Sequence, residues 1–172
     1  MPRALVVVDY QTDFVTGSLG SPQAEAIEKN IVSKIKEYLG NGEKVFFTMD
    51  THDEDYLNTD EGAHIPIEHC IRNTAGWSVH GEVGEYLGKG KVIEKRTFGS
   101  HDLVGPLKGF DAIELCGVAT NICVIANAVI LKTAYPDSKI IVDTKCVASY
   151  DEDLHRKALD IMRSLSIDIT DG

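Results

Sequence analysis

The sequence predicts an α/β protein: a three-layer α/β/α sandwich with a mostly parallel, Rossmann-like, six-stranded sheet. Two observations carry this prediction. Short apolar runs rich in β-branched residues recur along the chain, and helix-forming segments separate them. Strands that alternate with helices form βαβ units, in which the strands are parallel and the helices cover both faces of the sheet. With 172 residues and no linker-like segment, the chain is expected to form a single domain over residues 1–172.

The first two elements have clear boundaries. Residues 4–8 form an uninterrupted apolar run, which suits a strand covered on both faces. A helix is expected at residues 24–39, where Gly40 and Gly42 end it. Its apolar stripe consists of residues at steps of four: Ile27, Ile31, Ile35 and Leu39.

The remaining elements continue the alternation. Further strands are expected at residues 44–49, 91–94, 111–116, 139–143 and 167–170. Further helices are expected at residues 101–108, 121–134 and 152–165. A long irregular segment, residues 51–83, follows the second strand, and a loop of that length inside a compact domain is more commonly functional than idle.

Composition narrows the class of protein. The formal net charge is −10 and no run of Lys or Arg forms a basic stripe, so neither nucleic acid nor a membrane surface is an expected partner. The N-terminal apolar run is too short for a signal peptide. Four cysteines without a CxxC pair indicate reduced thiols and a cytoplasmic protein. Signature motifs of serine hydrolases, P-loop NTPases and dinucleotide-binding proteins do not occur.

Right-handed crossovers bring the carboxyl ends of parallel strands to one rim of the sheet, where such sheets bind ligands. Four expected strand ends carry reactive residue types: Asp9, Asp50, Lys95 and the segment CGVATNIC that ends at Cys123. The site is therefore expected at this rim.

Cys123 is the candidate nucleophile. With Thr120 as N-cap, it is expected near position N3 of the following helix, where free N–H groups and the helix dipole would lower its pKa and could stabilise an oxyanion. Taken alone, a free cysteine is more often a small buried apolar residue. The other three cysteines, Cys70, Cys116 and Cys146, are interpreted as structural.

Asp9 and Lys95 are the candidates that would support this nucleophile. A carboxylate directly after a buried strand can act as a base, although a lone Asp there more often caps a turn. Lys95 lies between Glu94 and Arg96, so a solvated face is the alternative interpretation. A cysteine beside an acid and a cation would make a working nucleophilic site.

Asp50, His52 and His69 are candidate metal ligands. Asp50 and His52 lie two residues apart at a strand end, and a histidine further along the loop can return to meet them. Two imidazoles and a carboxylate suit zinc, iron or manganese, and either Glu61 or His64 could add a ligand. The alternative is a set of loop residues that make ordinary hydrogen bonds.

Five segments carry a family resemblance in a fixed order. They are VVVDYQTDF, FFTMDTHDE, PIEHCIRNTAGW, EKRTFGS and CGVATNICV. In these segments the chain resembles the isochorismatase-like cysteine hydrolase superfamily, which includes nicotinamidases and N-carbamoylsarcosine amidase. The resemblance covers nearly the whole chain.

The resemblance implies roles for individual residues. Asp9, Lys95 and Cys123 match the catalytic triad, and Val118–Ala119 matches a cis peptide that turns the Ala119 N–H toward the Cys123 N–H to form an oxyanion hole. Further matches are the metal ligands Asp50, His52 and His69, a possible fourth ligand Glu61, and the substrate-flanking rings Phe14 and Phe98. The implied cofactor is a divalent metal ion (zinc, or iron or manganese), and the implied assembly is a homo-oligomer.

The implied activity is hydrolysis of a small amide through a thioester with release of ammonia, foremost nicotinamide to nicotinate. Many nicotinamidases have an aromatic residue where this chain has Pro66, which bears on the substrate. One alternative is another amide or ureide hydrolase, similar to N-carbamoylsarcosine amidase. Another is a catalytically silent binding module, which would be expected to lack one of the triad residues.

Overall fold

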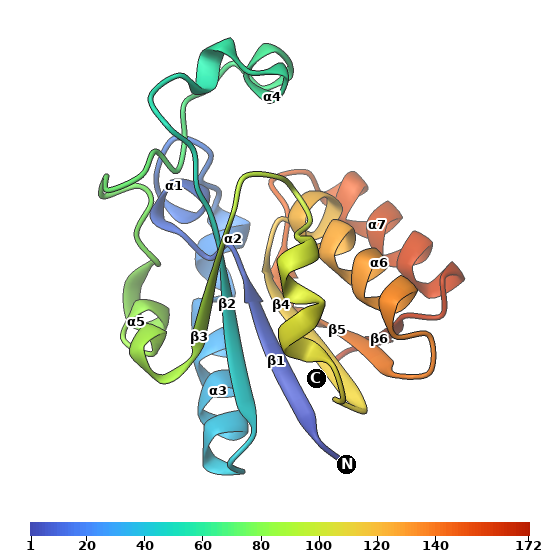
Figure 1. Ribbon diagram of the computed structural model, residues 1–172. Coiled ribbons are helices and arrows are strands. Elements are labelled where there is room, and N and C mark those ends of the chain that lie inside the picture. Colours follow the sequence, from blue (N-terminus) through green and yellow to red (C-terminus); the bar gives the residue numbers. More distant parts are fainter.

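The computed structural model describes residues 1–172 and contains one six-stranded sheet between two layers of helices (Figure 1). All five strand pairs are parallel, and the strand order is β3-β2-β1-β4-β5-β6. This is the strand order of a Rossmann-type sheet, with the order reversing between β1 and β4. The predicted fold class is confirmed.

The strands are β1 (Arg3–Val8), β2 (Lys44–Asp50), β3 (Lys91–Lys95), β4 (Ala112–Val118), β5 (Lys139–Ala148) and β6 (Asp168–Thr170). The α-helices are α1 (Thr12–Val15), α2 (Pro22–Ala26), α3 (Glu28–Gly40), α4 (Asp60–His64), α5 (Gly81–Gly84), α6 (Ile125–Ala134) and α7 (Glu152–Ser164). Short 3-10 turns cover Tyr56–Asn58, Leu87–Lys89, His101–Leu103 and Gly105–Leu107, and a π-helical turn covers Thr120–Val124. None of these helices combines the length and apolar character that crossing a membrane requires.

The helix predicted at residues 24–39 is two helices. Ser21 caps α2 by accepting a hydrogen bond from the Ala24 N–H, and Pro22 occupies the first turn, so the helical region begins earlier than its apolar stripe. The Tyr10 hydroxyl donates to the Ala24 carbonyl at 2.7 Å, and the helix is interrupted at Ile27. The tertiary contact with Tyr10 uses a carbonyl that an unbroken helix would bond internally.

Two other predicted elements differ in kind or length. The helix expected at residues 101–108 is a pair of 3-10 turns, and Pro106 in the second of them lacks an N–H to donate. The strand expected at residues 139–143 continues to Ala148 after a register shift against β4. The irregular segment at residues 51–83 contains α4, most of α5 and a 3-10 turn.

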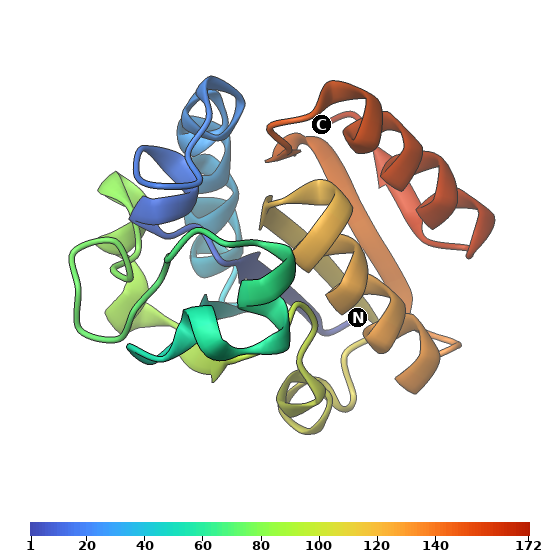
Figure 2. The same ribbon diagram turned by 90° about the horizontal axis from the view of Figure 1, so that it is seen from above.

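Alternate residues of β1 separate the two cores. Leu5 and Val7 pack with α3 on one face, and Val6 and Val8 pack with residues of α6 and α7 on the other. Seen from above, α3 and α5 lie on one side of the sheet and α6 and α7 on the other (Figure 2). Because all strand pairs are parallel, the carboxyl ends of the strands lie at the same rim of the sheet. The segment with α4 lies above this rim (Figure 1).

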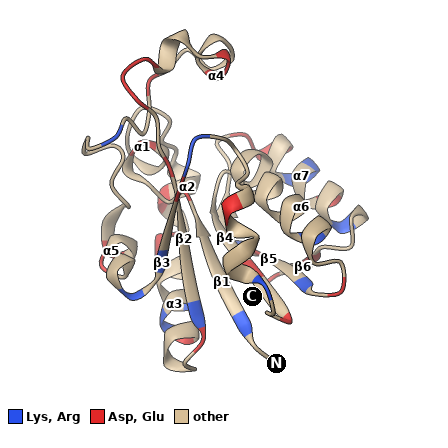
Figure 3. Cartoon of the chain, viewed as in Figure 1, with Lys and Arg blue, Asp and Glu red and all other residues tan.

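Charged side chains are scattered over the outer elements, and Figure 3 shows no gathering of Lys and Arg on the face in view. One buried ionic cluster lies away from the rim, and we call it the Lys34 cluster. Lys34 Nζ is 2.9 Å from both Glu114 Oε1 and Asp143 Oδ2, and Tyr38 donates to Glu114 Oε2 at 2.6 Å. Lys34 thus joins α3 to β4 and β5.

Replacing Lys34 by Met is expected to lower the free energy of unfolding by about 3 kcal/mol, because two buried carboxylates would lose their shared cation. Urea denaturation at pH 7 measures this effect. Lys36→Met is the matched control on the same helix, since Lys36 pairs with Glu82 in solvent and its loss should change little. Equal stability of the two variants would contradict the prediction.

The same variant has a pH signature. Burial alone would raise the pKa of Asp143, but hydrogen bonds from Lys34 and the Lys145 N–H outweigh burial and lower that pKa overall. A lowered pKa in the folded state stabilises the fold above the unfolded value of about 3.9, and this contribution disappears as the pH falls through the folded value. Unfolding measured from pH 7 to pH 3 should therefore show a steeper loss of stability below about pH 4 in wild type than in Lys34→Met.

Candidate active site

Asp9, Lys95 and Cys123 meet at the carboxyl rim of the sheet. Lys95, the last residue of β3, places Nζ 2.6 Å from Asp9 Oδ2 and 3.6 Å from Cys123 Sγ. Asp9 follows β1, and Cys123 lies in the π-helical turn after β4. At most 5% of each residue is exposed, so the three groups interact away from bulk water. The solvated-face interpretation of Lys95 is wrong, since this side chain points inward.

The backbone around Asp9 holds its carboxylate in place. Asp9 has a φ of 47°, a left-handed conformation that non-glycine residues adopt uncommonly and that recurs at functional sites. The Thr48 hydroxyl donates to Asp9 Oδ1 at 2.6 Å. Oδ2 receives no hydrogen bond of regular geometry, and Lys95 Nζ is its close cationic neighbour. One carboxylate oxygen is thus committed to β2 and the other is available for proton transfer.

The surroundings of Cys123 disfavour its thiolate. Burial raises its pKa well above the usual range, the Asp9 carboxylate raises it further, and the Lys95 ammonium offsets only part of that. Burial likewise raises the pKa of Asp9, although Lys95 works against it. The predicted lowering of the Cys123 pKa is therefore wrong for the free protein, because burial of the sulfur outweighs the Lys95 ammonium. A thiolate needs a base at the moment of reaction, and Asp9 is adjacent.

The predicted cap of the cysteine helix also differs. Residue Ala119 is the N-cap, and the Thr120 hydroxyl bonds to His155 Nδ1 at 2.8 Å instead of capping. The helix opens with a π-helical turn, an irregularity frequent at functional sites. His155, which makes this contact from α7, is partly buried.

The peptide bond between Val118 and Ala119 is cis, at the position that the family resemblance implied. Gly117 precedes it with a φ of 110°, and a Cβ at this position would lie 2.1 Å from the Val8 carbonyl oxygen. Only glycine therefore allows β4 to end so close to β1. This close approach brings the Ala119 backbone and the Cys123 turn beside Asp9.

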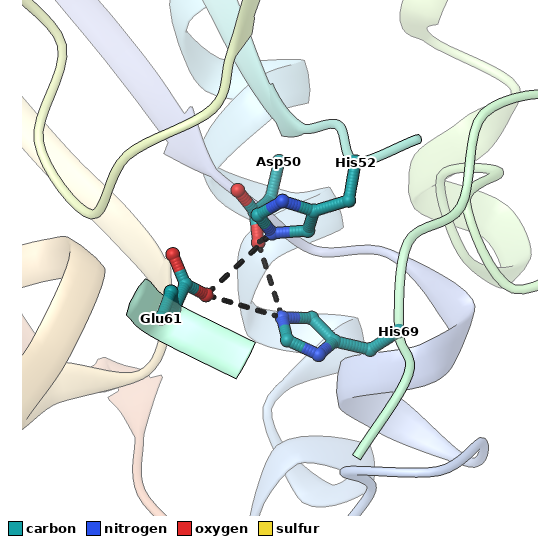
Figure 4. Close-up of side chains that lie close together, drawn as sticks. All are labelled: Asp50, His52, Glu61 and His69. Carbon is teal, nitrogen blue, oxygen red and sulfur yellow. Dashed lines mark hydrogen bonds and ion pairs between the residues drawn. The ribbon is translucent and has the colours of Figure 1, made fainter. Parts of the chain in front are cut away.

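A second group of side chains lies next to this trio. Four residues bring one ligand atom each within 4.8 Å of one another (Figure 4): Asp50, His52, Glu61 and His69. Asp50 Oδ2 is 3.0 Å from His52 Nε2 and 3.5 Å from His69 Nε2. Glu61 Oε1 is 3.6 Å from His52 Nε2 and 3.7 Å from His69 Nε2. His64, the alternative fourth residue, is largely exposed at the cavity mouth and bonds to the Asp60 carbonyl.

The four side chains fit a divalent cation. Metal–ligand bonds of about 2.0–2.1 Å in a tetrahedron separate the ligand atoms by roughly 3.3 Å, and the four distances scatter around that value. Burial and the neighbouring Asp50 raise the pKa of Glu61, so a cation between the two carboxylates would relieve their repulsion. His69 Nδ1 lies 2.8 Å from the Ile67 carbonyl, which leaves Nε2 for a metal.

Sequence reasoning missed the residues that position these ligands. Gln11 is fully buried and bonds both backbone groups of Asp50, accepting from its N–H and donating to its carbonyl, each at 2.8 Å. The Tyr56 ring lies 4.6 Å from the His52 ring and 4.8 Å from the His69 ring, measured between centroids. Gln11 lies two residues after Asp9 in the first family segment, which was the available signal. Tyr56 offered no comparable signal, because its position depends on the path of the long segment.

One cavity of about 490 Å³ connects the two groups. Cys123, Ala119 and Val118 line its floor, and Asp50, Glu61 and His69 line one wall. Phe14 from α1 and Phe98 after β3 both line it, and the Phe14 ring lies 5.4 Å from the His69 ring. Ile65 and Pro66 also border it. The structure thus brings all the predicted site residues around one space or directly beneath it, with His64 at its mouth and outside the four-residue group.

A parallel α/β sheet with a buried cysteine, carboxylate and ammonium at its carboxyl rim defines the class of α/β cysteine hydrolases. The chain belongs to the isochorismatase family, since the family model of the Isochorismatase domain matches residues 3–172.

Individual relatives agree with this membership. The chain is 32% identical to the uncharacterized isochorismatase family protein PncA of Bacillus subtilis, over 92% of this chain and 93% of that protein. Its structure is similar to that of the nicotinamidase/pyrazinamidase PncA from Bacillus subtilis, with a TM-score of 0.88, 28% identity and coverage of 99% and 100% of the two chains. It is also similar to the pyrazinamidase of Pyrococcus horikoshii in complex with zinc, with a TM-score of 0.86, 25% identity and 99% coverage of both chains.

Proposed function

We propose that this protein is a metal-dependent cysteine amidohydrolase that converts nicotinamide to nicotinate and ammonia. The observation that carries the proposal is the position of Cys123, with Asp9 and Lys95, at the floor of a cavity that also reaches a four-residue metal group. The relatives named nicotinamidase and pyrazinamidase support the same chemistry.

The charge of the cavity favours a neutral substrate. Neither Lys nor Arg is among the residues that line it, whereas Asp50 and Glu61 are. With a divalent ion bound, Asp50 and Glu61 would balance its charge, so the lining offers no Lys or Arg to pair with a carboxylate on the substrate. This disfavours N-carbamoylsarcosine and isochorismate, which both carry carboxylates, and favours a neutral heteroaromatic amide held between Phe14 and Phe98.

The trio performs the covalent steps. Asp9 takes the proton of the Cys123 thiol, and the sulfur attacks the amide carbon while Lys95 balances the charge of the pair. We place the developing oxyanion at the backbone N–H groups of Ala119 and Cys123. Asp9 then returns the proton to the departing nitrogen, so that ammonia leaves and a thioester remains. Water, deprotonated by Asp9, hydrolyses the thioester to the carboxylate and the thiol.

In this proposal the metal site binds and orients the substrate, and the covalent steps belong to Asp9, Lys95 and Cys123. Asp50, His52, His69 and Glu61 would hold a divalent ion, for which zinc is our proposal on the basis of the two imidazoles and the zinc-bound relative. When bound, the ion supplies a Lewis acid for a ring nitrogen and so orients the substrate. Gln11 fixes the backbone of Asp50 and Tyr56 packs on both imidazoles, so the ligands are already held together by the chain.

Ammonia release from three compounds tests the proposal. Nicotinamide should be hydrolysed, benzamide, which lacks the ring nitrogen, should be hydrolysed more slowly, and N-carbamoylsarcosine should release no ammonia. Hydrolysis of N-carbamoylsarcosine in preference to nicotinamide would make the substrate assignment wrong but would leave the cysteine-dependent mechanism in place. Absence of release from all three would contradict the proposal and favour a binding role for the fold.

A further inference from the structure

The segment between β3 and the next 3-10 turn carries one wall of the cavity. This segment, Thr97 to Ser100, is called the 97–100 loop. The Thr97 carbonyl accepts a hydrogen bond from Lys95 Nζ at 2.8 Å, and the Thr97 hydroxyl donates to the Gly99 carbonyl at 2.6 Å. Phe98 lines the cavity with 41% of its surface exposed. The position of this loop therefore determines where the Phe98 ring can contact an aromatic ring of the substrate.

Asn127 fastens this loop to the helix that carries the nucleophile. It lies on α6, is completely buried and does not line the cavity. Its Oδ1 accepts from the Ser100 N–H at 2.9 Å, and its Nδ2 donates to the Cys123 carbonyl at 2.8 Å and to the Phe98 carbonyl at 3.3 Å. The orientation of the amide follows from its partners, because a backbone N–H can only donate and a carbonyl can only accept.

The loop also packs directly on α6. A Cβ at Gly99 would lie 2.6 Å from Ile130 Cδ1, which can rotate away, and 3.2 Å from the backbone carbonyl group of Ala126, so a side chain there would shift the loop by a few tenths of an ångström. Close packing and the Asn127 hydrogen bonds thus act on the same contact. The buried Asn127 amide thus bonds both the backbone of Cys123 and the backbone of the 97–100 loop.

We propose that Asn127 is a positioning residue that fixes the position of the Phe98 ring relative to the Cys123 sulfur. The substrate's ring and carbonyl are rigidly connected, so the distance between their two contact points must match the substrate. A shift of about 1 Å in such an arrangement can lower the rate about 100-fold. This inference rests on the proposed amidase function, and it assigns Asn127 no contact with the substrate.

Asn127→Leu removes all three hydrogen bonds with little change in volume. We expect its kcat/KM for nicotinamide to fall at least about 10-fold. Leu131→Ala is the matched control, since Leu131 is equally buried on the same helix, belongs to the hydrophobic core and has a side chain that makes no hydrogen bond to the loop. Gly99→Ala displaces the loop by a different route and should lower kcat/KM in the same direction, which keeps the test open if Asn127→Leu does not fold.

A double-mutant cycle with Phe98→Ala distinguishes positioning from general damage. If Asn127 acts through Phe98, the Asn127→Leu change should cost at most about threefold in the Phe98→Ala background. Independent, multiplicative losses would overturn the inference. So would an Asn127→Leu enzyme that matches Leu131→Ala in kcat/KM.

Alkylation of Cys123 by iodoacetamide, followed by peptide mass spectrometry, separates this inference from the proposed function. The nicotinamide concentration that halves the alkylation rate should rise about 10-fold in Asn127→Leu. The rate without nicotinamide should stay within about threefold, because Asp9 and Lys95 remain. If nicotinamide protects Cys123 of the wild type from alkylation but the wild type releases no ammonia, the proposed function is wrong and the role of Asn127 in placing the bound compound stands. An unchanged half-protecting concentration would overturn the role of Asn127, and absence of protection in wild type would count against both.

Discussion

Cys123→Ala is expected to lower ammonia release from nicotinamide by at least about 10³-fold while the fold persists. In the proposed mechanism, no thioester can form without the sulfur, and Asp9 and Lys95 then have no nucleophile to activate. Steady-state release of ammonia, measured beside thermal unfolding of the same sample, checks the prediction.

Cys146→Ala is the matched control for this experiment. Cys146 is also buried and free, but it contacts Asp143 in the Lys34 cluster and does not line the cavity. The control should keep wild-type kcat. Full activity in Cys123→Ala would make the nucleophile assignment wrong, and inactivity in both variants would point to damage to the core.

The second large effect concerns metal binding. We expect the wild type to bind about one equivalent of zinc and His69→Ala to bind it at least about 100-fold more weakly, because His69 Nε2 lies 3.5 Å from Asp50 Oδ2 and 3.7 Å from Glu61 Oε1. Competition with a chromogenic chelator measures both affinities. Removal of the metal should lower kcat/KM for nicotinamide about 100-fold, and added zinc should restore it.

His64→Ala is the control for metal binding. His64 borders the same cavity but is exposed and lies outside the four-residue group, so its loss should leave the zinc affinity unchanged. Zinc binding that survives in His69→Ala, or is lost in His64→Ala, would show that the ion uses different ligands.

Much of the fold follows from local patterns. Each strand contains apolar residues, some of them β-branched, so all six strands could be placed from the sequence, with errors at their ends. The helix predicted at residues 24–39 is present with a break at Ile27, and the Tyr10 hydroxyl, two residues beyond β1, bonds the Ala24 carbonyl just before that break. An apolar stripe reports which face of a helix is buried and contains no information about a polar contact from elsewhere in the chain.

The candidate site divides in the same way. Asp50 and His52 could be paired from their spacing. The choice of Glu61 and not His64 as the fourth candidate ligand depends on the turn of α4, which directs Glu61 toward His52 and leaves His64 in solvent. Asn127 offered no signal, since its three partners include Phe98 and Ser100, more than 25 residues away. The protonation state of Cys123 was also not readable, because desolvation depends on what surrounds the sulfur.

The sequence by itself determined the order of strands and helices and the residue types at the strand ends, because periodicity and turn residues act over a few positions. From the alternation of elements it followed that Asp9, Asp50, Lys95 and Cys123 would share one rim. Only the tertiary structure decided which of them touch, at which distances and in which protonation state. Those properties arise from burial and from contacts between segments more than a hundred residues apart, such as Asp9 with Cys123, and no local pattern encodes them.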